Sequence, residues 1–307
     1  MKSLEAKSPL TNSNNVKQKL IIKTDFLIKE WEKSNIDVAR FFLGLKEIYL
    51  YECLDTGFKF FYPLNLEGDS RFYEDLQKFS WYYMNWKWEY EKVLGLIQSD
   101  FSVLEIGCGP GDFLKKLKEK NIKAVGLEFN DEAIRKCEEK KITVYQETIQ
   151  KHALNNAEKY DLVCSFQVME HIAKIKDALT ASLATLKPGG LLIISVPNDD
   201  SFIKNDPYNL METPPHHMSR WNKKSLESIA RIFNLELLDI YFEPLQDYNY
   251  RYYYKIICGD RIDKIFGPLG KYINLILGKI SLYLMVHTNL PQKIKGHTIM
   301  AVYQKNA

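Results

Sequence analysis

The sequence has no excess of charge of either sign. Its 42 Lys and Arg residues nearly balance 39 Asp and Glu residues, which leaves a formal net charge of +3 on 307 residues. Binding to nucleic acid through the phosphates needs a dense basic face, and this balance gives no sign of one. We therefore expect no nucleic-acid partner.

Paired cysteines are missing too. The five cysteines are scattered and form no C-x-x-C pair. Three of them stand in apolar or glycine-rich stretches, which is typical of reduced core residues in a cytoplasmic protein. We expect a cytoplasmic location and no metal site built on cysteine. The residues are Cys53, Cys108, Cys137, Cys164 and Cys258.

Long uninterrupted apolar runs are also absent. No stretch supplies the ~20 apolar residues that a membrane crossing needs, and the nearest to it, residues 272–286, contains Lys279. The first twenty residues lack the apolar segment of a signal peptide, because Ser, Asn and Lys recur there. They predict a mobile polar tail over residues 1–20.

What the chain does contain is a buried strand that runs directly into a glycine-rich turn. Residues 103–106 predict the strand, residues 107–111 (Gly-Cys-Gly-Pro-Gly) the turn, and residues 113–120 a helix. Three glycines in five positions let the backbone bend tightly and approach a ligand, and the free N–H groups of the helix point to the same place. The turn therefore predicts a site for an anionic or polar small molecule.

The spacing of the glycines distinguishes between known turns of this kind. The third glycine follows the first by four residues, whereas the dinucleotide motif G-x-G-x-x-G/A needs five, and the phosphate loop G-x-x-x-x-G-K-[ST] has no match. With Glu105, the pattern E-x-G-x-G-x-G resembles the first motif of class I S-adenosylmethionine-dependent methyltransferases of the small-molecule type, such as bacterial sugar and quinone O-methyltransferases. The resemblance implies S-adenosyl-L-methionine as methyl donor and S-adenosyl-L-homocysteine as product. The alternative is a strand-to-helix turn without a ligand.

A second strand, residues 124–128, ends in a carboxylate. Glu128 lies 21 residues after Gly107. A carboxylate at this spacing in a nucleotide-binding sheet can accept hydrogen bonds from both ribose hydroxyls. Glu128 therefore favours an adenosine ligand, although an acid at a strand end can also cap a helix.

Strands and helices continue to alternate beyond this point. A helix over 131–140, a strand over 142–146, a strand over 160–166 and an apolar strand after Pro188-Gly189-Gly190 follow in turn, with a helix ending at Lys187. The run after residue 166, Gln-Val-Met-Glu-His-Ile, resembles the family's fourth motif. This alternation predicts an α/β fold with a doubly wound, mostly parallel, Rossmann-like sheet of seven strands, completed by strands at 235–242 and 298–303. Ligands in such sheets bind beyond the carboxyl ends of the strands.

The predicted cofactor residues come from these motifs, from an aromatic segment and from the loop after residue 146. Residues 79–90 contain seven aromatic rings and predict a helix, some of whose rings face the core and others the ligand. Thr148 and Ile149 enter by resemblance alone, because the family's equivalent loop flanks the adenine. The full set is Tyr83, Glu105, Gly107, Cys108, Gly109, Gly111, Glu128, Phe129, Thr148, Ile149 and Gln167.

Three histidines are the candidates for catalysis. Methyl transfer needs alignment and exclusion of water rather than a covalent enzyme intermediate, and a hydroxyl acceptor can be helped by a base. His171 follows the strand at 160–166, and His216 and His217 lie in a long polar loop. Each can also have a purely structural role. As metal ligands they need acidic neighbours, which the sequence does not place nearby, so we expect no metal.

The remaining segments predict the surroundings of this core. Residues 21–97 form an N-terminal helical cap, with helices within 21–50 and a hairpin over 49–63, ahead of a cofactor-binding core over 98–242. Asn222 can cap a helix over 223–233. A helical insertion over 243–295 precedes the last strand in 296–307, and its apolar part at 262–287 can serve as a lid, a homodimer contact or a membrane-surface contact.

The expected function is methyl transfer to a small hydroxylated acceptor, with a sugar or nucleotide-sugar of a bacterial surface glycan preferred because an aromatic-rich cap suits it. A quinone or lipid-linked acceptor is the alternative, motivated by the insertion. The third possible function is that of a partner subunit that binds the cofactor without catalysing a reaction.

Overall fold

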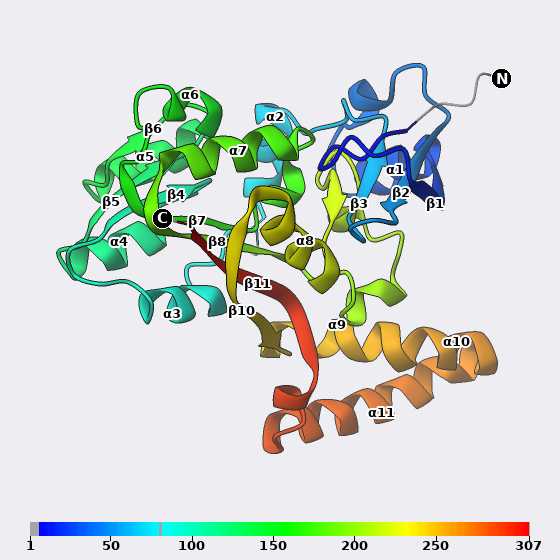
Figure 1. Cartoon of the computed structure of the whole chain (residues 1–307). Coiled ribbons are helices and arrows are strands. Elements are labelled where there is room, and N and C mark those ends of the chain that lie inside the picture. The colour runs from blue at the N-terminus through cyan, green and yellow to red at the C-terminus, as the bar shows by residue number, and fades with distance from the viewer. Residues whose placement is uncertain (1–5, 80–81, 307) are drawn as a thin grey trace.

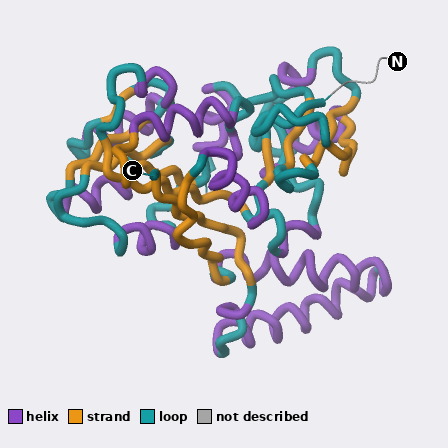
Figure 2. Tube along the Cα trace, viewed as in Figure 1, coloured by secondary structure: helices purple, strands orange, loops and turns teal. Residues whose placement is uncertain are grey.

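The computed structural model describes residues 6–79 and 82–306 and is built around a sheet of seven strands (Figures 1 and 2). The strand order is β10-β11-β8-β7-β4-β5-β6. Five strands are parallel to one another, and β11 runs antiparallel to both of its neighbours, β8 and β10. The predicted α/β fold is confirmed. The strands are β4 (Ser102–Ile106), β5 (Lys123–Leu127), β6 (Val144–Tyr145), β7 (Tyr160–Phe166), β8 (Leu186–Pro197), β10 (Leu235–Pro244) and β11 (Lys295–Lys305).

Helices cover both faces of this sheet because its strands are apolar on both sides. Leu104 and Val163 face one hydrophobic cluster, whereas Val103 and Leu162 face another. Neighbouring residues of a strand point to opposite faces, so each strand contributes to both clusters. The first cluster is closed by α6 (Ile149–Ala153), α7 (Ile175–Thr185) and α8 (Lys223–Phe233), and the second by α3 (Trp88–Leu94), α4 (Asp112–Glu119) and α5 (Asp131–Glu139).

Local signals placed several of these elements correctly. β7 and α8 have the predicted bounds, and Asn222 caps α8 by accepting the N–H of Ser225, whose own hydroxyl accepts the N–H of Asn222. The helix expected to end at Lys187 ends instead at Thr185. Residues 187–190 lie near the start of β8, where the pairing with β7 shifts register and Gly189 has a φ of 75°. The Pro-Gly-Gly segment is thus an irregularity within a strand.

The N-terminal cap differs from the predicted helical cap. Its centre is a four-stranded antiparallel sheet in the order β1-β2-β3-β9. The expected hairpin is confirmed as β2 and β3, and the helices within 21–50 are α1 and a single 3₁₀ turn. The cap elements are β1 (Val16–Lys23), α1 (Thr24–Glu32), η1 (Ala39–Phe42), β2 (Glu47–Cys53), β3 (Lys59–Tyr62), α2 (Ser70–Gln77) and β9 (Ser219–Arg220).

Two predictions for this region are wrong. Residues 6–20 are not a mobile tail, because Leu10 is fully buried and Val16 begins β1. Residues 1–5, which the same prediction included, lie outside the described part of the chain. The helix over 79–90 begins only at Trp88, and Ser80 and Trp81 lie outside the described part. A one-faced helix could not bury so many rings. The irregular backbone before α3 instead directs Tyr82 to His216 and Tyr83 to Gly109, while Tyr90 lies within α3 and contacts Phe113.

The insertion between β10 and β11 is helical, as expected, and its helices form a hairpin. α9 (Tyr250–Tyr254), a π-helical turn η6 (Lys255–Gly259) and α10 (Asp260–Phe266) form one arm, and α11 (Pro268–His287) returns along it. Gly267, with a φ of 53°, makes the bend between the arms. Figure 1 shows this hairpin, coloured orange, projecting away from the two sheets. Short 3₁₀ turns elsewhere are η2 (Met169–His171), η3 (Phe202–Asn205), η4 (Leu210–Glu212), η5 (Asp247–Asn249) and η7 (Pro291–Lys293).

Within the described part of the chain, α11 alone has the length and composition of a membrane-crossing helix, with a mean hydropathy of 1.3 over a window that is only 11% buried. The expectation that no segment reaches that length is therefore wrong for residues 268–287, although Lys271 and Lys279 lie within them. Length and composition alone do not establish a crossing.

Candidate active site

The candidate site lies where the parallel strands of the large sheet end. Gly107 follows β4, Glu128 follows β5, Gln167 follows β7 and Asn198 follows β8. Because these strands are parallel, their carboxyl ends meet at one edge, which is the position that ligands take in sheets of this kind. Residues that follow four different strands are thus brought to a common edge, and Gly107, Glu128 and Gln167 among them were predicted from the sequence.

The glycine turn has a backbone that other residues would adopt only with strain. Gly107, Gly109 and Gly111 have φ values of 67°, 51° and 76°. A Cβ on Gly107 would lie 2.5 Å from a methyl group of Val168, and a Cβ on Gly111 would lie 2.7 Å from the sulfur of Cys137. The glycines of the turn therefore pack directly against neighbouring side chains, with no room for a Cβ. A ligand can approach the turn only from the opposite side.

Glu128 holds the turn and the end of β5 together. One carboxylate oxygen accepts the N–H of Gly109 at 2.8 Å, and the other accepts the N–H groups of Phe129 at 2.7 Å and Asn130 at 2.9 Å. A carboxylate offers about four acceptor positions, so about one remains for a ribose hydroxyl. The acid thus caps backbone N–H groups of the turn and of the loop before α5, and its acceptance of ribose hydroxyls stays a prediction.

Glu105 lies below the turn with an unsatisfied oxygen. Its side chain is 1% exposed, and Oε2 has no hydrogen-bond partner within the described part of the chain. Burial raises the pKa of this carboxyl well above its ordinary value. A buried carboxyl group without a partner fits a ligand that carries positive charge, as the sulfonium and ammonium groups of S-adenosylmethionine do.

The other predicted cofactor residues fall into two groups. The ring of Tyr83 covers the turn, lying 3.1 Å from where a Cβ of Gly109 would be, and the buried Cys108 lies beneath it beside Gly126. Phe129 leaves 53% of its surface exposed next to Glu128. Thr148 instead caps α6 through the N–H of Lys151, and Ile149 is buried in the core, so their side chains are committed elsewhere.

Gln167 is held in a buried polar network rather than at the glycine turn. Its φ of 61° is left-handed, and its side-chain amide lies 3.2 Å from the hydroxyl of Ser195 and 3.4 Å from Glu89 Oε1. Ser195 donates to the same Glu89 oxygen at 3.0 Å. Glu89 was not predicted from the sequence; an acid in the middle of an apolar, aromatic segment was the available signal.

The three predicted histidines form a compact cluster. The ring centroids of His216 and His217 are 4.4 Å apart, and His171 lies 4.7 Å from the first and 4.8 Å from the second. His216 and His217 are buried, whereas His171 is partly exposed. Although 45 residues separate His171 from His216, the loop that follows β8 folds back over η2 and brings them together.

Tyrosines of the cap connect this cluster to the glycine turn. The hydroxyl of Tyr82 lies 3.3 Å from Nε2 of His216, and the neighbouring Tyr83 covers Gly109. The hydroxyl of Tyr73 lies 3.2 Å from Nδ1 of His171. Val168, three residues before His171, contacts Gly107. The histidines and the turn are therefore parts of one site.

Two carboxylates lie against the cluster, contrary to the expectation that it lacks acidic neighbours. Oε2 of Glu212 is 3.2 Å from Nδ1 of His217, and Oε1 of Glu170 is 3.9 Å from Nε2 of the same ring. The other oxygen of Glu212 is 3.2 Å from His297. The signal was present in the sequence, since Glu170 directly precedes His171 and Glu212 precedes His217 by five residues. The stated reason for excluding a metal is therefore wrong.

Burial controls the protonation of the cluster. Desolvation, followed by the charge on His217, lowers the pKa of His171 to about 3 and lowers that of His216 well below its ordinary value. Burial acts to raise the pKa of Glu212, but His217 and His297 hold it well below the usual range. His171 and His216 are consequently neutral near pH 7, and imidazoles of such low basicity are poor proton acceptors.

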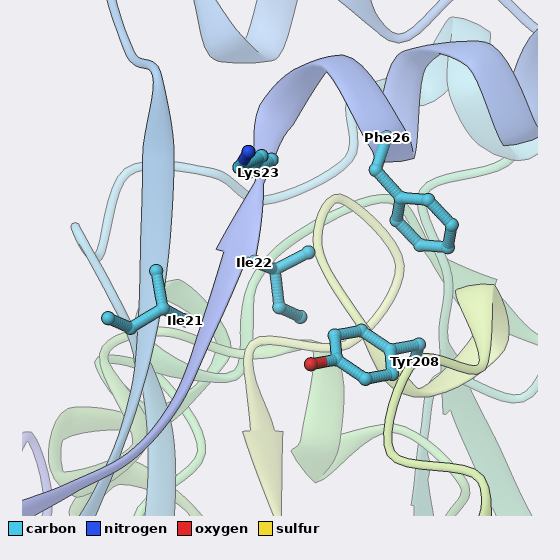
Figure 3. Close-up of a pocket in the computed structure, with 5 residues that line it drawn as sticks. All are labelled: Ile21, Ile22, Lys23, Phe26 and Tyr208. Atoms are coloured by element: carbon cyan, nitrogen blue, oxygen red, sulfur yellow. The ribbon is translucent and has the colours of Figure 1, made fainter.

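A separate cavity of about 410 Å³ lies between the cap and the loop that carries His216 and His217 (Figure 3). It is lined by Ile21, Ile22, Lys23, Phe26 and Tyr208. None of the sequence-predicted site residues contributes to its walls. We therefore assign it no part in the chemistry.

The fold, the glycine turn and the acid after the second strand of the core define the class of protein as a methyltransferase domain that uses S-adenosylmethionine. A family model described as a methyltransferase domain matches residues 81–240, just over half of the chain. The chain belongs to that family. S-adenosylmethionine is its methyl donor, and the bare turn, Glu128 and the unpartnered Glu105 fit that molecule.

Among curated proteins, the chain is similar to ubiquinone biosynthesis O-methyltransferases. It is 30% identical to that of Vibrio parahaemolyticus over 114 residues, which is 35% of this chain and 48% of the relative. It is 29% identical to that of Vibrio vulnificus over 102 residues, or 31% of this chain and 43% of the relative. The chain thus matches less than half of the length of these relatives.

Among solved structures, a methyltransferase from Archaeoglobus fulgidus that depends on S-adenosylmethionine has the same fold. The TM-score is 0.51 at 19% identity, over 71% of this chain and 91% of the other. This likeness supports the architecture of the core.

Proposed function

We propose that the protein transfers a methyl group from S-adenosylmethionine to a hydroxyl oxygen of a small acceptor that binds against His171, His216 and His217. The observation that carries the proposal is the position of this histidine cluster, which the adjacent Tyr82 and Tyr83, together with Val168, connect to the glycine turn. A cofactor held by the turn therefore has the imidazoles of the cluster and the buried carboxyl group of Glu170 close to it, where an acceptor can bind.

S-adenosylmethionine, when bound, supplies an electrophilic methyl group, and its sulfur keeps the electrons of the broken bond. This chain's own residues have three tasks. The turn and Glu128 hold the adenosyl end, while Tyr82 and Tyr83 cover the space between the turn and the cluster and exclude water. The cluster orients the acceptor hydroxyl, whose proton has to leave. That one histidine acts as the base stays a prediction, and the low pKa of His171 disfavours that residue.

The preferred acceptor from the sequence, a sugar or nucleotide-sugar, remains a proposal that the tyrosine-rich wall supports. Aromatic rings with hydroxyl tips suit a sugar. Tyr73 and Tyr82 both direct hydroxyls at the cluster. A quinol or a lipid-linked acceptor is the second candidate. The names of the ubiquinone biosynthesis relatives agree with a quinol, and the exposed hairpin favours an acceptor located at a membrane.

The exposed apolar surface of the hairpin is the structural support for a quinol or lipid-linked acceptor. α11 has only Gly270 and Met285 buried, and its apolar side chains are exposed over more than half of its circumference. Residues with large exposed fractions are Leu269 at 58%, Tyr272 at 70%, Leu275 at 60%, Ile276 at 61% and Tyr283 at 63%. A soluble monomer rarely exposes a contiguous patch of this kind.

Charge favours an anionic bilayer, rather than a second copy of the chain, as the occupant of this surface. Residues 250–295 contain eight Lys or Arg residues, all exposed, and only two Asp residues, whereas the whole chain has a net charge of only +3. Two like-charged hairpins repel each other, but basic residues beside an apolar face attract anionic lipid. Exposed tyrosines such as Tyr272 and Tyr283 also suit the headgroup layer.

The base of the hairpin lies beside the candidate active site. β10 enters it and β11 leaves it at the edge of the sheet where β8 ends, because Thr298 pairs with Pro197. Its first helix contacts the loop of the histidine cluster, since the hydroxyl of Tyr252 donates to Asp206 at 2.9 Å and accepts from Asn209 at 2.6 Å. A membrane bound by the hairpin would therefore bring a lipid acceptor close to the cluster.

The test measures S-adenosylhomocysteine formation from S-adenosylmethionine with nucleotide-sugars and simple phenols in solution, and with a quinol in anionic vesicles. Product with any hydroxylated acceptor supports methyl transfer, and the soluble and vesicle arms separate the two acceptor classes. Calorimetric binding of S-adenosylhomocysteine without product in either arm would instead favour a cofactor-binding subunit. Absence of binding at millimolar concentration would refute the cofactor site.

A further inference from the structure

We infer that His171, His216, His217 and Glu170 form a binding site for one divalent transition-metal ion, with the Nε2 atoms of the three rings and a carboxylate oxygen of Glu170 as ligands. The three histidines place ligand atoms within 4.8 Å of one another, and no other group of this kind occurs within residues 6–79 and 82–306. The inference goes beyond methyl transfer and can be tested without it.

The hydrogen bonds of the three rings leave the correct nitrogens for a metal. Nδ1 of His171 lies 2.6 Å from the carbonyl oxygen of His216, and Nδ1 of His216 lies 2.8 Å from that of Met211. Nδ1 of His217 faces Glu212. A carbonyl oxygen can only accept, so the first two rings carry their proton on Nδ1. This places the lone pair on Nε2, as metal-binding histidines require.

The side chain of Glu170 supports a metal site independently of the three histidines. It is 1% exposed, and both of its carboxylate oxygens lack a hydrogen-bond partner within the described part of the chain. An unsatisfied buried carboxyl group is costly. Oε1 lies 3.9 Å from Nε2 of His217, on the side of the ring opposite to Glu212. A cation between Glu170 and the three rings would satisfy this group.

The donor set selects the kind of metal. Imidazole nitrogens with one carboxylate suit Zn²⁺ and similar transition metals, whereas Ca²⁺ and Mg²⁺ prefer oxygen ligands throughout. Ligands of a tetrahedral Zn²⁺ lie about 3.3 Å apart at ordinary Zn–N distances, so the side chains must draw together by about an ångström or more. Binding also replaces the contact between the Tyr82 hydroxyl and Nε2 of His216.

A metal in this position would also act on an acceptor hydroxyl bound beside the cluster. A cation favours the ionised form of a nearby hydroxyl. The cluster would then not need to supply an imidazole base. Glu212 would be a positioning residue, because it contacts Nδ1 of His217 rather than the proposed ion.

The experiment titrates the chelator-treated full-length protein with Zn²⁺ in a calorimeter and records the visible spectrum of Co²⁺ in its place. We expect one ion per chain. Glu170→Gln should weaken binding by at least about tenfold, and Glu212→Gln, which disturbs the orientation of His217, by about 10–100-fold. His287→Asn removes an exposed histidine on α11 and is the matched control, expected to bind Zn²⁺ as the wild type does.

Binding of S-adenosylhomocysteine is measured on the same samples, so that loss of the metal site can be distinguished from loss of the cofactor site. Glu170→Gln should retain it, whereas Glu105→Gln, the other buried carboxyl group with an unpartnered oxygen, should weaken it and retain Zn²⁺ binding. Absence of Zn²⁺ binding in a wild-type protein that binds S-adenosylhomocysteine overturns the metal site and leaves the methyltransferase proposal intact. Equal Zn²⁺ affinity in wild type and Glu170→Gln overturns it as well.

Discussion

The side chain of Glu128 accepts a hydrogen bond from the backbone N–H of Gly109 at 2.8 Å. The acid at the end of β5 and the turn after β4 are therefore in direct contact, across 19 residues of sequence that contain α4. One short contact fixes the distance between the two parts of the chain that were each expected to bind adenosine. The cofactor site is thus organised by the protein before a ligand enters.

Glu128→Ala should weaken binding of S-adenosylhomocysteine by about 1–3 kcal/mol, the cost of leaving hydrogen-bonded groups without a charged partner. The loss combines the ribose contact with the loosened turn. Isothermal calorimetry measures it, and Glu139→Ala, at an exposed position of α5, is the control. Equal affinities for wild type and Glu128→Ala would contradict the assignment of this acid.

Gly107→Val should abolish cofactor binding. The new side chain has to adopt a φ of 67° and to occupy space within 2.5 Å of Val168. Gly44→Val is matched in backbone strain, because Gly44 has a φ of 75°, but a Cβ there meets nothing within 4 Å. Thermal melts should show some destabilisation in both variants, while calorimetry should show loss of binding only in the first.

Substitution of the apolar face of α11 should release the protein from anionic vesicles. Leu275→Glu combined with Ile276→Glu places two negative charges at positions that are 60% and 61% exposed, where they oppose both the apolar contact and the lipid charge. Co-sedimentation with vesicles rich in phosphatidylglycerol measures the effect, and Leu154→Glu, at an 80% exposed position of the core domain, is the control.

Analytical ultracentrifugation of the same proteins tests the alternative that the α11 surface forms a homodimer contact. A wild-type dimer that dissociates in the double variant, without vesicle binding by either protein, would assign the α11 surface to a second copy of the chain. Vesicle binding by a monomer would assign it to the bilayer.

Glu105 should make the stability of the ligand-free protein depend on pH. Burial raises the pKa of its carboxyl in the folded state well above the ordinary value of 4.5. Above about pH 4.5 the unfolded chain therefore binds fewer protons at this group than the folded chain does, so stability falls as the pH rises from there toward the folded-state pKa. Denaturant unfolding at several pH values should show this fall for wild type and a smaller one for Glu105→Gln.

Asn222→Ala should lower the free energy of unfolding by about 0.5–2 kcal/mol, because it removes the acceptor for the N–H of Ser225 at the start of α8. The effect should be on stability alone, since α8 packs on the core rather than at the glycine turn. Urea titration gives the loss, and Asn222→Asp, which retains an acceptor, should recover most of it.

Local rules explain the elements that were predicted well. The bounds of β7 and α8 follow from a run of apolar residues and from a capping residue with its partner three positions on, and the glycine turn follows from the spacing of three residues. Each of these signals lies within one element or one turn of chain. Backbone dihedral preferences and nearest-neighbour hydrogen bonds act at that range.

The incorrect predictions concern segments whose structure depends on distant partners. Val16–Lys23 is polar enough to resemble a tail, yet it is a strand because β2 pairs with it. The aromatic segment before Trp88 was predicted to be part of a helix, but the rings of Tyr82 and Tyr83 pack instead against His216 and Gly109. No local pattern contains those partners, so local patterns could not give the outcome.

By itself, the sequence determined the class of fold, the glycine turn, Glu128 and the presence of three histidines after strands of the core, because these depend on the order of residues along short stretches. Only the tertiary structure decided that Glu170 and Glu212 lie on either side of His217, and that the hairpin exposes its apolar face. Glu170 and Glu212 are more than 40 positions apart in the sequence, and the exposure of the hairpin depends on what the rest of the chain covers. Chain packing, which balances burial against hydrogen bonding over the whole molecule, sets relationships of that kind.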